Sequence, residues 1–442
     1  MFRNGHYSAS DMLLKCPSST LYDLTGVCVL EMGPVPLSLL LSVLFLLCVT
    51  PALSSGEDDY TWPQRKMPLV IDRRTVRLSV SSFSAERRSE LNSTCGIECQ
   101  REFPEPSLEA LQEMLSYETM YENGTRTLTS VTLQELEVTP ENTSSSSTSR
   151  RKREVYGPDT RFTISDKQYS MKYPFSTAVK LSTGCTGVLV SPKHVLTAAH
   201  CIHDGTDYIK GAEKLSVGVL RDKKKGGKKR RGKGRKEEGE AEKVDTENTE
   251  IGGKKRERKY KGRKSRSRRS AASGKPTFRW TRVKKTQIPK GWFKGVSDSA
   301  EADYDYAVLE LKKAQKVQHM ELGIIRSVRK LPASRIHFSG FDDDRPGNLV
   351  YRFCSVSDES NDLMYQQCDA KPGASGAGVY VRLKEPGKRK WKRKVIGVFT
   401  GHQWVQVNGQ QQDYNVAVRI TPVKFAQICS WVHGDSSMCQ NT

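Results

Sequence analysis

The chain has little sustained hydrophobicity, and it lacks the residue spacings that mark common metal sites. Its mean hydropathy is −0.60, which indicates a globular part joined to polar segments that cannot bury a core. No Cys-x-x-Cys or His-x-x-x-His spacing occurs in the 442 residues, so we expect no metal and no cofactor. An uncharged apolar run of thirteen residues, from Leu37 to Val49, is too short for a membrane span, and none is expected.

The apolar run from Leu37 to Val49 has the length of a signal-peptide core. Small residues follow it, with Ala52 and Ser54 at the −3 and −1 places of a cut after Ser54. Counted from Met32, no basic residue precedes the core, and an uncleaved signal anchor is the alternative. We predict a signal peptide over residues 32–54, an unstructured upstream extension over residues 1–31, and a secreted, extracellular protein.

The cysteine content fits an oxidising compartment. The chain has eleven cysteines, and three of them, Cys16, Cys28 and Cys48, lie before the expected signal cut. The remaining eight form an even set, which indicates disulfides in a secreted chain, although eight cysteines allow about 105 pairings. Pairing of nearest neighbours is the simplest prediction, and it gives Cys185–Cys201, Cys354–Cys368, Cys95–Cys99 and Cys429–Cys439.

Residues 55–153 form a polar leader that ends in a serine-rich linker. Three N-glycosylation acceptors lie in it, at Asn92, Asn123 and Asn142, and none follows. Four consecutive basic residues end at Arg153, and in this setting they resemble a proprotein-convertase site, with a solvated run of charge as the alternative. We therefore predict a glycosylated pro-segment that a proprotein convertase cuts after Arg153.

From Arg161 onward, short apolar or alternating runs recur between turn signals, which is typical of an all-β domain. Only the end of the chain has helical spacing. Apolar residues recur there at intervals of three and four, and Pro422 stands at the first position of the predicted helix, which extends to Val432. The strand-like runs are Ser176–Leu181, Gly187–Val190, Leu215–Leu220, Tyr306–Leu311, Val379–Leu383, Val395–Phe399 and Tyr414–Ile420.

A glycine-flanked serine, Ser375, lies in the stretch Gly-Ala-Ser-Gly-Ala-Gly at residues 373–378. Such a stretch is usually a plain turn, so alone it indicates little. A serine hydroxyl needs a base within hydrogen-bond reach to act as a nucleophile. It also needs amide donors aimed at the developing oxyanion, and a sharp turn at Gly373 lets its N–H and that of Ser375 point the same way.

Two upstream stretches offer partners for this serine. His200 follows a strand-like run, and Cys201 beside it could pin the loop by pairing with Cys185. An imidazole can take and return a proton near neutral pH. Asp305 precedes an alternating strand, where a half-buried carboxylate can fix the imidazole tautomer. Taken singly, His200 is a structural or surface histidine, and Asp305 is a turn residue at a strand edge.

Together, the order His200, Asp305, Ser375 and the surrounding motifs resemble the chymotrypsin-like (trypsin-type) serine protease family. The motifs are Thr-Ala-Ala-His-Cys, Asp-Tyr-Ala-Val-Leu-Glu-Leu and Gly-Ala-Ser-Gly, and the resemblance covers roughly residues 170–432. It implies an all-β fold of two antiparallel β-barrels of chymotrypsin type with a C-terminal helix. The protease domain would span residues 154–442, and the amides of Gly373 and Ser375 would form the oxyanion hole.

Three further stretches, at residues 336–340, 358–362 and 401–404, resemble a small group of secreted vertebrate members of that family. One member of the group has a similar basic insertion. It is described as inactive because threonine stands at its nucleophile position, whereas this chain has Ser375.

The chain lacks two features that the family usually has. Ala374 stands in place of the aspartate that pairs with a freed apolar N-terminus, and the predicted cut would free Glu154, so activation by that ion pair is excluded. No cysteine stands immediately before Pro372, so the disulfide beside the specificity pocket is missing. Asp369 is the candidate for binding a Lys or Arg side chain of a substrate, with a turn residue as the alternative.

Residues 221–270 hold 23 Lys or Arg against 9 Asp or Glu, a net charge of +14 in a chain of net charge +22. Two basic blocks flank an acidic centre, Glu237–Glu250, and we predict a disordered loop between two strands. In a secreted protein such blocks indicate binding to heparan sulfate or another polyanion. Nucleic acid is less favoured because Tyr260 is the only aromatic residue, and a spacer without a ligand is a further alternative.

Two functions follow from these features. The expected one is a secreted serine endopeptidase that hydrolyses protein substrates through an acyl-enzyme, with Ser375 as nucleophile, His200 as base and Asp305 as orienter. The alternative is a catalytically inactive pseudoprotease that acts as an extracellular matrix- or heparin-binding module. The complete triad favours the endopeptidase, and Ala374 favours the pseudoprotease.

Overall fold

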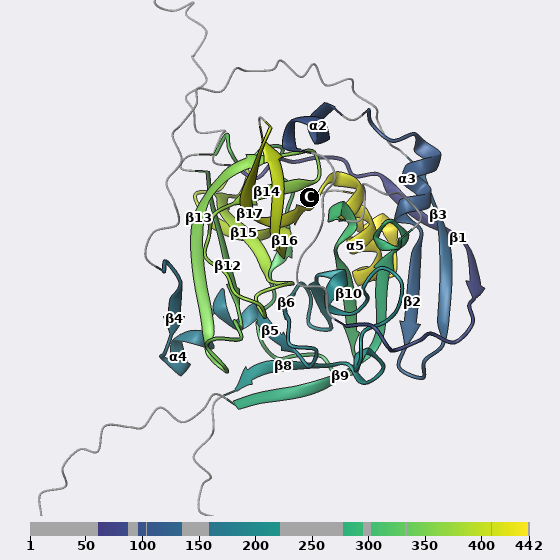
Figure 1. Ribbon diagram of the computed structural model, residues 1–442, viewed down its shortest axis with the longest axis horizontal. Helices are drawn as coiled ribbons and strands as arrows, with labels where there is room; N and C mark the ends of the chain where they lie inside the picture. Colours follow the sequence, from purple (N-terminus) through teal and green to yellow (C-terminus); the bar gives the residue numbers. More distant parts are fainter. Residues whose placement is uncertain are drawn as a thin grey trace, which may run out of the picture. The chain divides into compact units, whose positions relative to one another are not determined.

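The computed structural model describes residues 61–86, 96–102, 104–134, 159–221, 277–294, 302–331, 334–407 and 409–440, which are coloured in Figure 1. All of them belong to one unit, Gly56–Thr442. No helix in these residues is long and apolar enough to cross a membrane. Several expected features lie outside the described residues, namely the upstream extension, the signal peptide, Asn92, Asn142, Arg153 and residues 222–270.

Six short strands close a barrel in the first half of the expected protease domain. Hydrogen bonding follows the order β9-β10-β7-β6-β5-β8, and β8 pairs back with β9 to close the ring. Valine and leucine side chains from every strand fill the interior, as a small barrel requires. The strands are β5 (Ala178–Leu181), β6 (Thr186–Leu189), β7 (His194–Thr197), β8 (Ser216–Arg221), β9 (Thr277–Pro289) and β10 (Ala307–Leu311).

The leader adds three strands to this barrel, where the sequence had indicated only a polar segment. Strand β2 pairs with β9, β3 pairs with β2, and β1 pairs with β3, so the sheet reaches nine strands. Figure 1 shows these strands side by side beyond β10. The leader elements are β1 (Leu69–Arg77), α2 (Ile97–Glu102), α3 (Leu108–Leu115), β2 (Tyr117–Tyr121) and β3 (Arg126–Gln134).

A second sheet forms a ring from the remaining strands. Its order is β16-β15-β12-β13-β14-β17, and β16 pairs back with β17. Strand β4 (Phe162–Ile164) pairs with β13, and β11 (Glu321–Leu322) runs parallel to β16. The ring strands are β12 (Arg335–Gly340), β13 (Leu349–Glu359), β14 (Leu363–Gln366), β15 (Gly378–Lys384), β16 (Trp391–Val407) and β17 (Gln410–Arg419).

The C-terminal helix α5 (Pro422–His433) begins where the sequence predicts and ends one residue later than expected. Pro422 occupies its first position, and Gly434 ends it in the left-handed conformation, with φ of 72°. The Trp431 ring packs edge-on against Tyr117 of the leader at a centroid distance of 5.1 Å. A four-residue helix, α4 (Lys167–Ser170), precedes the first barrel. The expected all-β fold of two antiparallel barrels with a C-terminal helix is confirmed.

Disulfides join three of the nearest-neighbour cysteine pairs. They are Cys185–Cys201, Cys354–Cys368 and Cys429–Cys439, which close short loops in the first barrel, the second barrel and the C-terminal segment. Cys99 is also disulfide-bonded, and Cys95 lies outside the described residues. Of the three glycosylation acceptors, Asn123 is described and lies exposed in the turn between β2 and β3.

Candidate active site

The register of two strands brings His200 and Asp305 together. Strands β7 and β10 pair antiparallel with Thr197 opposite Ala307, so the residues just after β7 and just before β10 lie at the same end of the barrel. His200 Nδ1 lies 2.7 Å from Asp305 Oδ2, and the His200 backbone N–H donates to Asp305 Oδ1 over 2.8 Å. Both side chains are buried, at 3% and 0% exposure. The carboxylate therefore fixes the ring as the tautomer with hydrogen on Nδ1.

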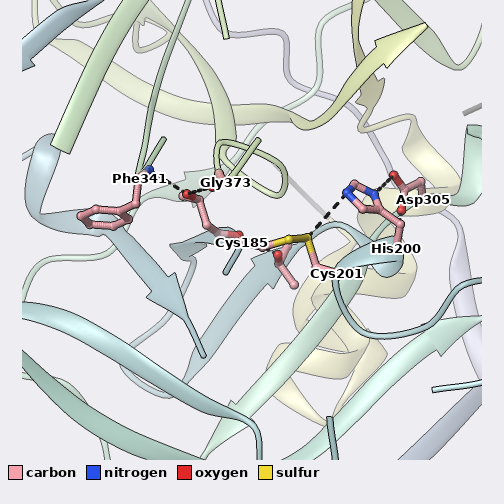
Figure 2. The surroundings of a disulfide bond; sticks show 8 residues. Cys185, His200, Cys201, Asp305, Phe341 and Gly373 are labelled. Carbon is pink, nitrogen blue, oxygen red and sulfur yellow. Dashed lines mark hydrogen bonds and ion pairs between the residues drawn. A yellow bond between two sulfur atoms is a disulfide. The ribbon is translucent and has the colours of Figure 1, made fainter. Parts of the chain in front are cut away.

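The other ring nitrogen of His200 faces a disulfide. His200 Nε2 lies 3.7 Å from Cys201 Sγ, as Figure 2 shows. In the neutral tautomer neither atom has a proton to donate, so this contact is van der Waals packing. Ligand atoms of Cys185, His200 and Cys201 lie within 4.8 Å of one another, but the two sulfurs are bonded to each other. No thiolate is therefore present in this cluster to hold a metal ion.

The loop that holds Ser375 is fixed by hydrogen bonds from Thr186 of the first barrel. Thr186 N donates to Ser375 O over 2.9 Å, and Thr186 Oγ1 donates to Gly373 O over 2.7 Å, a bond drawn in Figure 2. Gly376 has φ of 84°, and a Cβ there would lie 2.2 Å from both Thr186 O and Thr197 Oγ1. Only glycine fits between the loop and the barrel at that position.

Ser375 itself is half-buried, and no hydrogen bond joins its hydroxyl to His200 in the described part of the chain. Among these same residues, the amides of Gly373 and Ser375 donate no hydrogen bond, whereas Ala374 N donates to Lys371 O. The loop thus presents two amide N–H groups that could donate hydrogen bonds to an anion or a carbonyl oxygen. In the described part of the chain, no base is hydrogen-bonded to the serine hydroxyl.

A buried ion cluster around Asp342 supports the loop before Ser375. Ala374 is fully buried. Asp342 is also fully buried and accepts from Arg352 Nη2 over 2.6 Å and from Arg161 Nη1 over 2.9 Å. Asp342 also accepts from Lys371 N over 3.3 Å, and Asp343 N donates to Pro372 O over 2.8 Å. The loop before Ser375 is therefore anchored to this cluster without a freed N-terminus.

Sequence reasoning missed this cluster. Hydrogen bonds that Arg161 donates to Asp344, Asp159 and Asp342 raise its pKa. Burial lowers the pKa of Arg352, and Asp342 opposes that shift. Three consecutive aspartates after a buried strand were the available signal, because acidic side chains beside a core need cationic partners. The sequence could not identify Arg161, because 181 positions separate it from Asp342.

The structure places Asp369 against the start of the domain. Its Oδ2 accepts from Thr160 N and from Thr160 Oγ1, each over 2.8 Å. A carboxylate that binds a substrate Lys or Arg needs its oxygens free for that cation. Thr160 occupies one of these oxygens, and a role of Asp369 in substrate specificity stays a prediction.

The known proteins that are similar in sequence to this chain are serine proteases or inactive serine proteases. A family model described as Trypsin matches residues 164–251. Inactive serine protease 35 from Homo sapiens is 57% identical over 406 residues, covering 90% of this chain and 98% of that protein. The Bos taurus protein of the same name is 62% identical over 389 residues, covering 87% and 94%. Serine protease 23 from Homo sapiens is 47% identical over 410 residues, covering 91% and 98%. Among solved structures, a Glu endopeptidase aligns over 63% of this chain and 99% of that chain, with 17% identity and a TM-score of 0.38.

These relatives correct the expected function. Proteins from four mammals that are 53% to 62% identical to this chain carry the name inactive serine protease 35. The expectation of an active serine endopeptidase is therefore wrong, and the pseudoprotease alternative is the better supported one. Similarity of this degree extends over about nine-tenths of the sequence. The chain belongs to the trypsin family of serine proteases and their inactive homologues, in the group of inactive serine protease 35 and serine protease 23.

Proposed function

We propose that this protein is a secreted, catalytically inactive protease homologue that acts by binding heparan sulfate or another extracellular polyanion. The main support for inactivity is that relatives up to 62% identical to this chain carry the name inactive serine protease 35. The position of His200 supports it. With Nδ1 committed to Asp305 and Nε2 packed on the Cys201 sulfur, the imidazole makes no hydrogen bond to Ser375 within the described residues.

The binding part of the proposal rests on charge. Residues 221–270 carry a net charge of +14 and follow directly from the end of β8. Basic blocks with few apolar side chains attract a polyanion by releasing its counterions, which makes such binding sensitive to salt. The apolar run at residues 37–49 supports secretion, and the four basic residues before Glu154 support processing by a proprotein convertase.

Heparin chromatography tests the binding part. A variant in which a short Gly-Ser linker replaces residues 222–270 keeps Arg221, which pairs with Thr277 at the ends of β8 and β9. We expect this variant to leave heparin resin at a clearly lower NaCl concentration than the full chain. Deletion of the acidic centre, residues 237–250, is the matched control and should not weaken retention. An unchanged elution salt for the linker variant would remove the insertion as the polyanion site.

A further inference from the structure

The outer face of the second barrel carries arginines and aromatic rings side by side. Six residues define this arginine–aromatic face: Phe162, Arg335, Phe353, Arg382, Trp391 and Arg393. They come from five neighbouring strands, β4, β13, β12, β15 and β16, which Figure 1 shows on the side away from β1–β3. Four spacings between adjacent strands give the face a width of roughly 19 Å.

The strand register places these side chains on one face. Arg382 lies opposite Arg393 in the β15–β16 pair, and Lys384 lies opposite Trp391. Directly paired residues of an antiparallel sheet point to the same side. Two arginines in such a pair repel each other, which costs free energy unless an anion lies between or above them.

Each arginine of the face lies over an aromatic ring. The guanidinium carbon of Arg335 lies 4.8 Å from the Phe353 ring centroid, and that of Arg382 lies 5.2 Å from the Trp391 centroid. The guanidinium of Arg393 lies 6.0 Å from the ring of Tyr173. Among the described residues, no carboxylate forms an ion pair with any of the three. A ring beneath a guanidinium orients its N–H groups but does not neutralise its charge.

His337 lies in the middle of this face, where the charges of the three arginines act on its ring. It is opposite Phe353 on one side and Tyr380 on the other, and its Nδ1 lies 2.8 Å from Tyr351 Oη. Burial lowers the pKa of His337 to about 4, and the charges of Arg335, Arg393 and Arg382 contribute in the same direction. All three arginines therefore lower the pKa of His337, and no carboxylate is among the groups that shift it.

We propose that the arginine–aromatic face binds the sulfate groups of an extended sulfated polysaccharide. This inference rests on the proposed function, because it gives the same class of polyanion a second site, on the folded barrel. The planar fork of arginine matches sulfate oxygens in pairs. The Phe162 ring at one end of the face is 53% exposed and can pack against the C–H groups of sugar rings.

The arrangement favours a sulfated sugar over single-stranded nucleic acid. Binding of nucleic acid without sequence preference uses open aromatic faces on which bases stack. On this barrel, guanidinium groups already lie over Phe353 and Trp391. A sulfated chain needs the guanidinium forks rather than the ring faces, and these forks have no carboxylate partner in the described structure.

The test measures the affinity of purified protein for immobilised heparin at 150 mM NaCl, in the full chain and in the chain with the 222–270 linker. The double variant Arg382→Gln/Arg393→Gln should bind at least about tenfold more weakly in both backgrounds. Arg382→Lys/Arg393→Lys keeps the charge and loses the fork, so we expect an intermediate loss. Lys210→Gln/Lys214→Gln removes the same charge from the first barrel and should change the affinity less than twofold. Thermal unfolding confirms that each variant is folded.

The outcomes separate this inference from the proposed function. If the affinity for heparin falls with the 222–270 linker but not with Arg382→Gln/Arg393→Gln, the arginine–aromatic face is not a binding site and the insertion is. If the affinity falls only with the arginine variant, the face is supported as the binding site and the insertion is excluded. Equal binding of desulfated heparin would overturn the recognition of sulfate. Tighter arginine-dependent binding to a 20-nucleotide single-stranded DNA, or to phosphatidylserine vesicles, would overturn the choice of a sulfated sugar.

Discussion

At the scale of single residues, the His200–Asp305 pair has a role that does not depend on catalysis. Asp305 is fully buried and accepts hydrogen bonds from the backbone and the ring of His200. Removing a buried acceptor leaves its donors unsatisfied, and this costs more than an average hydrogen bond contributes. The pair thus holds the loop after β7 against the start of β10, whether or not the site is catalytic.

Asp305→Ala should therefore lower the free energy of unfolding by roughly 2–4 kcal/mol, because two His200 donors lose their buried acceptor. Ser375→Ala is the matched control. Its hydroxyl is half-buried and has no side-chain hydrogen bond in the described structure, so the change should stay within about 0.5 kcal/mol. Urea unfolding monitored by circular dichroism measures both. Similar stabilities for the two variants would contradict a structural role for Asp305.

His203 makes stability depend on pH. The ring is buried between the edges of Tyr208 and Phe293, and its Nδ1 accepts from Gly205 N over 3.0 Å. Burial lowers the pKa of His203 to about 3, whereas the unfolded chain titrates near 6.5. The folded state holds the neutral form, so its stability is fully present above pH 6.5 and is lost as pH falls toward 3.

His203→Asn removes this titration while keeping an acceptor for Gly205. We expect the variant to be less stable at pH 7.5, because the ring contacts with Tyr208 and Phe293 are lost. The difference from the natural chain should narrow by roughly 2–3 kcal/mol by pH 4.5. Thermal unfolding between pH 7.5 and 4.5 measures it. If the difference in stability between the two chains stays constant over this range, His203 has the same pKa in the folded and unfolded states.

At the scale of elements, the leader strands belong to the fold of the domain. Glu118 on β2 is buried and accepts from Arg126 Nε over 2.6 Å and from Tyr208 Oη. Strand β2 pairs with β9 over five residues, from Tyr117 to Tyr121. Large apolar side chains of the leader that are at most 6% exposed are Trp62, Met67, Val70, Ile97, Leu115, Tyr117, Met120, Val131 and Leu133. Together their burial contributes on the order of 10 kcal/mol before the cost of ordering the chain.

Cleavage after Arg153 should therefore leave the leader bound to the domain. We expect the two fragments to elute together in gel filtration at neutral pH and to separate on a denaturing gel. No disulfide should join the fragments, because the six cysteines after Arg153 pair with one another. Glu118→Ala, which removes the acceptor for Arg126 and Tyr208, should make the leader dissociate more readily. Release of the leader from the natural chain directly after cleavage would contradict this account.

The sequence predicts some elements of the fold better than others, and the reasons are physical. Short buried strands such as β10 (Ala307–Leu311) are apolar almost throughout, so their pattern is visible. Strand β1 has the sequence Leu-Val-Ile-Asp-Arg-Arg-Thr-Val-Arg and is largely exposed, so nothing marks it as part of a sheet. Strand β9 carries four basic residues in its first nine positions and is continuously buried only over its last four. Edge and extension strands depend on tertiary pairing, which periodicity does not report.

At the scale of the whole molecule, the candidate site was only partly predictable. The order of His200, Asp305 and Ser375 pointed to the family, and the structure places His200 and Asp305 in contact. The packing of His200 Nε2 on the Cys201 sulfur could not be predicted, because it depends on the rotation of one ring. The support of the loop by Asp342 and Arg161 was also hidden, because it joins segments far apart in the chain.

Binding without catalysis is the central claim about the whole molecule, and active-site labelling tests it most directly. The purified protein, before and after cleavage at Arg153, is treated with a fluorophosphonate probe beside Ser375→Ala, with an active trypsin as positive control. The account predicts equal, background labelling of both chains, because no base is hydrogen-bonded to the Ser375 hydroxyl in the described structure. A strong label that disappears in Ser375→Ala would contradict it.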